Sequence, residues 1–189
     1  MNKKVLIIHG WDGSPEEGWF PWLKTKLESK GYDVTVPPMP APQAPEINAW
    51  INKLENTATD VDENTFFVGH SIGCQTILRF LEKLPEGTKV GGVVCVAGWT
   101  QLNPEATPDN ESAAIAKPWI DKPMDWKKIK SHTNNFVAIF SDNDPLVPIS
   151  EKDVFEKRLG AKIMVLQNKG HFSGDDGVSE LPEVLSQFP

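Results

Sequence analysis

The chain has 189 residues, of which 39% are hydrophobic and 24% charged, and its formal net charge is −7. This length fits one domain with a sizeable core, so we expect a single globular domain over residues 1–189. The acidic balance argues against nucleic acid and anionic membranes as partners, because both attract basic surfaces.

The first residues imitate a secretory signal, because two lysines precede an apolar run at 5–8, but that run has only four residues. A signal needs about 7–15 apolar residues, and no stretch of the chain approaches the roughly 20 of a membrane-spanning helix. The chain has only two cysteines, Cys74 and Cys95, so a disulfide framework and zinc-type cysteine spacing are excluded. We expect a cytoplasmic protein whose two cysteines are small core residues.

Short apolar, β-branched runs alternate with helical patterns along the chain. This alternation predicts a parallel sheet with helices on both faces, and the runs are too uniformly apolar for strands with one wet face. The predicted strands are 5–8, 34–36, 66–68, 90–96, 136–140 and 163–166.

Helices are predicted between these strands, where apolar residues recur at helical spacing. The predicted helices are 19–30, 45–54, 72–84, 150–159 and about 179–187. Asp175 and Asp176 are interpreted as the start of the last helix, because carboxylates suit the positive end of the helix dipole.

Two stretches interrupt the alternation. Residues 37–45 are rich in proline and form neither a helix nor a central strand. Residues 98–126 contain four prolines and lie between two predicted strands. Because this stretch is too long for a plain loop in a compact domain, we expect a small cap or lid-like insertion there.

A candidate nucleophile lies in the sequence Gly69-His70-Ser71-Ile72-Gly73, between the predicted strand 66–68 and the predicted helix 72–84. The G-x-S-x-G pattern is typical of a nucleophile elbow, a tight strand-to-helix turn that needs small residues on both sides of the serine. The motif also occurs by chance, so its position between strand and helix decides the interpretation. We predict Ser71 as the nucleophile, and the alternative is a turn with an incidental serine.

A serine nucleophile needs a base, and after such an elbow the acid and then the histidine follow in sequence. Asp144 follows the predicted strand 136–140, and His171 follows 163–166. Because ligands bind at the carboxyl ends of the strands in open α/β sheets, we expect Ser71, Asp144 and His171 to meet there. Asp142 is the alternative acid, and Pro145, which fixes the chain just after Asp144, favours Asp144.

Backbone N–H groups are needed to stabilise an oxyanion. The candidates are Ile72, directly after the nucleophile, and Trp11, in the loop after the first strand. Trp99, Trp119 and Trp126 are candidates for an apolar acyl pocket under the lid.

The remaining histidines receive no catalytic role. His9 and His70 flank the expected site and are interpreted as packing or supporting residues, whereas His132 lies in a polar loop and is expected to be solvated. The histidine spacing offers no metal-binding pair, so we expect neither a metal nor a cofactor.

With these motifs, the sequence resembles the family of small serine hydrolases grouped with retinoblastoma-binding protein 9 and the bacterial YdeN-type proteins. The likeness spans nearly the whole chain and includes His9-Gly10, Trp19-Phe20-Pro21-Trp22, Pro38-Met39-Pro40, Gly69-His70-Ser71-Ile72-Gly73, Asp144-Pro145 and Gly170-His171-Phe172. The resemblance implies a three-layer α/β-hydrolase fold, with a mostly parallel six-stranded sheet in the order 2-1-3-4-5-6. It also implies the triad Ser71, Asp144 and His171. The chain departs from the family in lacking a Leu-x-Cys-x-Glu motif, so a retinoblastoma-type interaction is not expected.

Together these features predict a carboxylesterase-like serine hydrolase that cleaves small acyl esters through an acyl-serine intermediate. Two alternatives stay open, because a fold does not dictate a function. One is a non-catalytic protein-binding module on a hydrolase fold, and the other is a peptidase or amidase.

Overall fold

The computed structural model describes residues 3–188. Its centre is a six-stranded parallel sheet in the order β2-β1-β3-β4-β5-β6, which confirms the predicted fold class. The strands are β1 (Lys4–Ile8), β2 (Asp33–Thr35), β3 (Thr65–His70), β4 (Gly92–Val96), β5 (Phe136–Ser141) and β6 (Lys162–Leu166).

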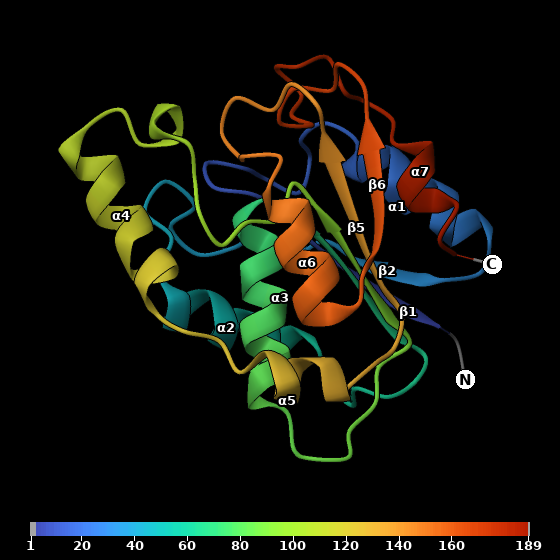
Figure 1. The fold of residues 1–189 in the computed structure, drawn as a ribbon. Coiled ribbons are helices and arrows are strands. Elements are labelled where there is room, and N and C mark those ends of the chain that lie inside the picture. Colours follow the sequence, from blue (N-terminus) through green and yellow to red (C-terminus); the bar gives the residue numbers. More distant parts are fainter. Residues whose placement is uncertain (1–2, 189) are drawn as a thin grey trace.

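Helices cover both faces of this sheet (Figure 1). In the described residues they are α1 (Phe20–Ser29), α2 (Ile47–Thr57), α3 (Ile72–Lys83), α4 (Asn110–Asp121), α5 (Trp126–Ser131), α6 (Glu151–Leu159) and α7 (Pro182–Leu185), with a 3₁₀ turn η1 (Pro104–Ala106). The last helix is shorter than the predicted 179–187, and a separate α5 was not foreseen.

Two hydrophobic cores lie on opposite faces of the sheet because successive side chains of a strand point to opposite sides. In β1, Val5 and Ile7 pack in the core with α1 and α7. Leu6 and Ile8 pack in the core with α2, α3, α5 and α6. Burial on both faces explains why the strands read as continuous apolar runs.

The predicted insertion at 98–126 contains η1 and α4, on the side of the sheet that α2 and α3 cover (Figure 1). Arg79 of α3 anchors the end of α4, since its Nη2 donates to the carbonyls of Trp119 at 2.9 Å and Lys122 at 2.8 Å. A cation suits the carbonyls at a helix C-terminus. At the other end of α4, Asp109 is the N-cap residue, and its carboxylate accepts the N–H of Ser112 at 2.8 Å. The lid role of this segment stays a prediction.

Candidate active site

Ser71 occupies a strained turn between β3 and α3, with φ 53° and ψ −121°. The chain packs so closely there that a Cβ at Gly73 would lie 2.3 Å from the carbonyl oxygen of Ile8. A Cβ at Gly69 would lie 2.7 Å from the backbone nitrogen of Cys74. Both contacts are impossible for a larger residue, so the two glycines of the motif are required by the geometry of the elbow.

The side chains of Asp144 and His171 are paired, although 27 residues separate them. Nδ1–H of His171 donates to Oδ2 of Asp144 at 2.9 Å, and the distance from Nδ1 to Oδ1 is 3.1 Å. The carboxylate is fixed in turn by the backbone N–H groups of Leu146 at 2.8 Å and Val147 at 3.0 Å. With side chains 13% and 3% exposed, His171 and Asp144 form a well-shielded pair.

The alternative acid, Asp142, makes a different contact. Its Oδ1 accepts the backbone N–H of Asn168 at 2.8 Å, and the residue is exposed. Of the two candidate acids, only Asp144 therefore contacts the imidazole of His171.

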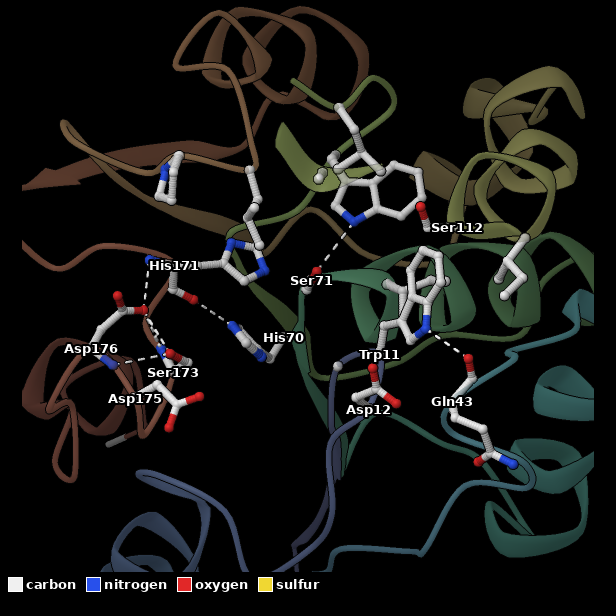
Figure 2. Close-up of a pocket in the computed structure, with 18 of the residues that line it drawn as sticks. Trp11, Asp12, Gln43, His70, Ser71, Ser112, His171, Ser173, Asp175 and Asp176 are labelled. Carbon is white, nitrogen blue, oxygen red and sulfur yellow. Dashed lines mark hydrogen bonds between the residues drawn. The ribbon is translucent and has the colours of Figure 1, made fainter. Parts of the chain in front are cut away.

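Ser71 and His171 line one cavity with a volume of about 770 Å³. The imidazole of His171 lies beside Ser71 and points toward its hydroxyl group (Figure 2). The two residues follow β3 and β6, and Asp144 follows β5, so all three lie past the carboxyl ends of parallel strands. This is the edge of an open α/β sheet at which ligands bind.

Asp176 holds the loop that carries His171. Its Oδ2 accepts the backbone N–H of His171 at 2.9 Å, the backbone N–H of Ser173 at 3.1 Å and the hydroxyl of Ser173 at 2.7 Å (Figure 2). Burial opposes ionisation, but these hydrogen bonds hold the pKa of Asp176 below its ordinary value. The placement of Asp175 and Asp176 at the start of the last helix was wrong, because α7 begins only at Pro182. The short-range Ser-x-x-Asp spacing was the available signal for this turn.

His70 joins the elbow to the same loop. Its Nε2 lies 2.7 Å from the carbonyl oxygen of His171, and a carbonyl only accepts, so Nε2 carries the proton. Burial lowers the pKa of His70 to about 3, and the neighbouring His171 adds to this effect. His70 is therefore a neutral donor that supports His171, as the sequence predicted.

The other two histidines are buried and do not line the cavity. Nε2 of His9 accepts the backbone N–H of Met39 at 3.0 Å, so His9 links the loop after β1 to the proline-rich segment; burial lowers the pKa of its imidazole. His132 is fully buried, and its Nδ1 lies 2.7 Å from the carbonyl oxygen of Thr88. The prediction of a solvated His132 was wrong, because this contact draws the end of α5 against the segment before β4.

Both predicted oxyanion-hole residues line the cavity. Ile72 is the first residue of α3, where backbone N–H groups have no partner inside the helix. Trp11 lies in the loop after β1, and its indole donates to the carbonyl of Gln43 at 3.0 Å. Next to it, the N–H of Asp12 donates to the carbonyl of Pro42 at 2.8 Å. These bonds hold the Trp11 loop against the segment before α2.

Comparison with known proteins identifies the family of this chain. The family model described as "Serine hydrolase" matches residues 5–189. The chain belongs to this serine hydrolase family. It is 34% identical to YdeN of Bacillus subtilis (strain 168), with 100% of this chain and 97% of that protein covered. It is 27% identical to the serine hydrolase RBBP9 of Rattus norvegicus, with 92% and 89% covered.

Solved structures share the fold of this serine hydrolase. The crystal structure of the ydeN gene product from B. subtilis superposes with a TM-score of 0.89 at 32% identity, and 99% of each chain is covered. A carboxylesterase structure from Nitrososphaera gargenis has a TM-score of 0.72 at 14% identity, with 99% of this chain and 89% of that chain covered. At such low identity the second likeness concerns the fold alone.

Of the three tryptophans predicted for the pocket of the hydrolase, Trp99 lines the cavity. Trp119 instead donates its indole N–H to the carbonyl of Pro45 at 2.9 Å and packs edge-on against Trp50. Trp126 packs against Phe155. The pocket role expected of Trp119 and Trp126 is therefore corrected, because both fasten helices to the core beside the sheet.

Among the described residues, the cavity lining of the hydrolase includes several carboxylates and no lysine or arginine. The acidic lining residues are Asp12, Glu17, Asp109, Glu111, Asp175 and Asp176. Burial raises the pKa of Glu17, and repulsion from Asp175 and Asp12 raises it further. The lining therefore carries a negative potential that opposes the entry of anions.

Within residues 3–188, no group of histidine, cysteine, aspartate or glutamate side chains has the arrangement of a metal site. The same residues contain no helix with both the length and the apolar character that a membrane crossing needs.

Proposed function

We propose that this serine hydrolase cleaves small carboxylic esters through an acyl intermediate on Ser71, with His171 as the base and Asp144 as the acid that orients it. The observation that carries the proposal is the Asp144–His171 hydrogen bond of 2.9 Å, made by an imidazole that points toward Ser71 (Figure 2). A bond from Nδ1–H to a carboxylate leaves Nε2 unprotonated and able to accept the serine proton.

In the acylation step, the O–H bond of Ser71 breaks and its proton moves to Nε2 of His171. The serine oxygen forms a bond to the acyl carbon, and the carbonyl electron pair moves to the carbonyl oxygen. The imidazolium that results is stabilised by Asp144. Collapse of the tetrahedral intermediate breaks the bond to the leaving alcohol, which takes the proton from His171.

The backbone N–H groups of Ile72 and Trp11 are the proposed donors to the oxyanion. One such donor contributes about 3–4 kcal/mol to transition-state stabilisation. A helix N-terminus at Ile72 adds the positive end of the α3 dipole.

In the deacylation step, a water molecule replaces the alcohol. His171 takes a proton from the water molecule while the oxygen of that water attacks the acyl carbon. The second intermediate collapses by breaking the bond to the oxygen of Ser71, which recovers the proton from His171 and releases the acid.

The acidic lining favours the binding of neutral or cationic substrates over anionic ones. Carboxylates in a partly enclosed cavity repel a negative charge more strongly than they do in water. A matched pair of p-nitrophenyl esters, the butyrate and the hemisuccinate, measures this preference. We expect kcat/KM to be higher for the neutral butyrate, with a difference that shrinks as salt is added.

Fluorophosphonate labelling followed by mass spectrometry tests the nucleophile. The wild-type protein should gain one label on Ser71, and the Ser71→Ala variant should gain none and lose p-nitrophenyl ester hydrolysis. Labelling of another residue, or ester turnover that survives Ser71→Ala, would refute the proposal. If the protein hydrolyses a p-nitroanilide faster than the matched ester, the proposed activity changes from esterase to amidase.

A further inference from the structure

The turn after β4 brings Trp99 next to the nucleophile. Ala97, directly after β4, has φ 48°, and a Cβ at Gly98 would lie 2.6 Å from the ring of Phe155. The backbone therefore turns sharply in a place that only small residues can occupy. This turn buries the indole of Trp99 to 1% exposure while leaving it in the cavity lining.

The indole of Trp99 is bonded to the proposed nucleophile. Its Nε1 lies 3.3 Å from the Oγ of Ser71 (Figure 2). An indole N–H only donates, so the serine oxygen is the acceptor. The oxygen of Ser71 thus has a buried donor from the turn after β4 on one side and the imidazole of His171 on another.

These two neighbours restrict the direction of attack. A serine oxygen has four tetrahedral directions: the bond to Cβ, the bond to its proton and two lone pairs. When the proton points to His171 and one lone pair accepts from Trp99, a single lone pair stays free. That lone pair is the one that can form the bond to an acyl carbon in the cavity.

We infer that Trp99 is a catalytic residue whose indole N–H stabilises the negative charge that develops on Oγ of Ser71. This inference rests on the proposed function. Charge develops on Oγ twice: in acylation, as its proton moves to His171, and in deacylation, as the bond from Oγ to the acyl carbon breaks and its electron pair returns to oxygen. The same N–H faces the oxygen at both moments.

The length of the bond fits this role. At 3.3 Å it is longer than a typical N–H···O bond of about 2.9–3.0 Å, so in the resting enzyme it orients the serine oxygen but is weaker than a typical hydrogen bond. Hydrogen bonds to a charged oxygen shorten to about 2.7–2.9 Å and strengthen roughly twofold. An interaction that is stronger in the transition state than in the ground state is one that accelerates a reaction.

Trp99→Phe removes the N–H and keeps a buried aromatic ring. Trp119→Phe is the matched control. Trp119 is also buried, at 2% exposure, and this substitution also removes one indole hydrogen bond, the one to the carbonyl of Pro45. The burst and steady-state phases of p-nitrophenyl ester hydrolysis report acylation and deacylation separately. We expect Trp99→Phe to slow both about 10-fold, the size of one hydrogen bond to a developing charge, with KM within about twofold.

We expect Trp119→Phe to lower the melting temperature without changing either rate. Unchanged rates in Trp99→Phe, or an equal loss in Trp119→Phe, would overturn the role of Trp99 while the esterase itself stands. Wild-type protein that neither hydrolyses esters nor takes the fluorophosphonate would instead overturn the proposed function, and the role of Trp99 with it.

Nitrogen-15 NMR tests the hydrogen bond without turnover. The chain has seven tryptophans, and the indole signal missing from Trp99→Phe identifies that of Trp99. In Ser71→Ala this signal should shift and its exchange with water should change, because the acceptor is gone, while the signal of Trp119 stays in place. A Trp99 signal that is identical with and without the hydroxyl of Ser71 would refute the contact.

Discussion

The elbow that carries Ser71 and the loop that carries His171 are held by different kinds of interaction. The elbow is fixed by backbone packing, since a Cβ at Gly73 would lie 2.3 Å from the Ile8 carbonyl oxygen. The His171 loop is fixed by side-chain hydrogen bonds, above all those that Asp176 accepts. The nucleophile therefore depends on steric fit in the interior, and the base depends on a few polar contacts near the surface.

The difference predicts how each region fails when it is changed. Close packing in a dense interior transmits any added volume to the whole fold. Hydrogen bonds in a partly exposed loop affect mainly the local geometry. Changes in the elbow should therefore cost stability, and changes in the loop should cost activity.

The largest expected effect is that of Asp144→Asn on activity. The amide still fits the site, but it favours the wrong tautomer of His171 and cannot stabilise the imidazolium. We expect kcat to fall about 10⁴-fold with little loss of stability. Asp142→Asn is the matched control, because the carboxylate of Asp142 accepts the backbone N–H of Asn168 and is not paired with His171. Comparable losses in both variants would break the assignment of the acid.

The next largest effect concerns Gly73→Ala. Its Cβ would overlap backbone atoms that cannot move away, so we expect the free energy of unfolding to fall by about 3 kcal/mol. Gly174→Ala in the His171 loop is the control, since its nearest contact would be an ordinary 3.6 Å, and we expect a change within about 0.5 kcal/mol. Urea unfolding measures both. Equal stabilities would remove the contrast between the two regions.

The next prediction concerns His70, which links the elbow to the His171 loop. Its lowered pKa should make the stability of the protein depend on pH. Its folded pKa of about 3 lies below the ordinary value of 6.5, so the unfolded chain binds a proton that the folded protein does not. Stability should therefore be fully present above pH 6.5 and fall as the pH drops from there toward 3, by at most about 1.4 kcal/mol per pH unit.

His70→Gln keeps a donor for the His171 carbonyl but cannot be protonated. Urea unfolding at about pH 7 and about pH 4.5 should show a smaller acid loss in this variant than in the wild type. Identical losses in the two proteins would contradict the account of His70.

The smallest expected effect is that of Asp176→Asn. One acceptor oxygen survives, but its charge is lost, so the bonds to His171 and Ser173 weaken. We expect kcat/KM to fall about 10-fold while the melting temperature changes little. Glu180→Gln, an exposed change outside the cavity, is the control. A large loss of stability in Asp176→Asn would show that the loop is part of the core.

The sequence was sufficient where a local pattern implies local structure. Six apolar runs identified the six strands, and two glycines around Ser71 identified the elbow, because only glycine permits that approach of β3, α3 and β1. The order of Asp144 and His171 after later strands was also sufficient to place them at the same edge of the sheet.

Other features depend on contacts between residues far apart in the chain. His132 looked solvated in its polar loop, yet it is buried against Thr88, 44 residues away. Trp119 and Trp126 looked like pocket residues, yet they pack against α2 and α6. No short-range pattern reports these partners, because they are chosen by the arrangement of helices on the sheet.

The sequence by itself determined the parallel α/β fold and the positions of its candidate nucleophile and base, and it narrowed the acid to Asp144 or Asp142. Apolar periodicity, glycine spacing and the position of a residue after a predicted strand can all be read along the chain. Only the tertiary structure decided that Asp144 rather than Asp142 contacts His171, that Asp176 holds the loop of His171, and that Trp99 donates to Ser71. Those choices depend on side-chain directions at the ends of neighbouring strands, which exist only once the sheet has formed.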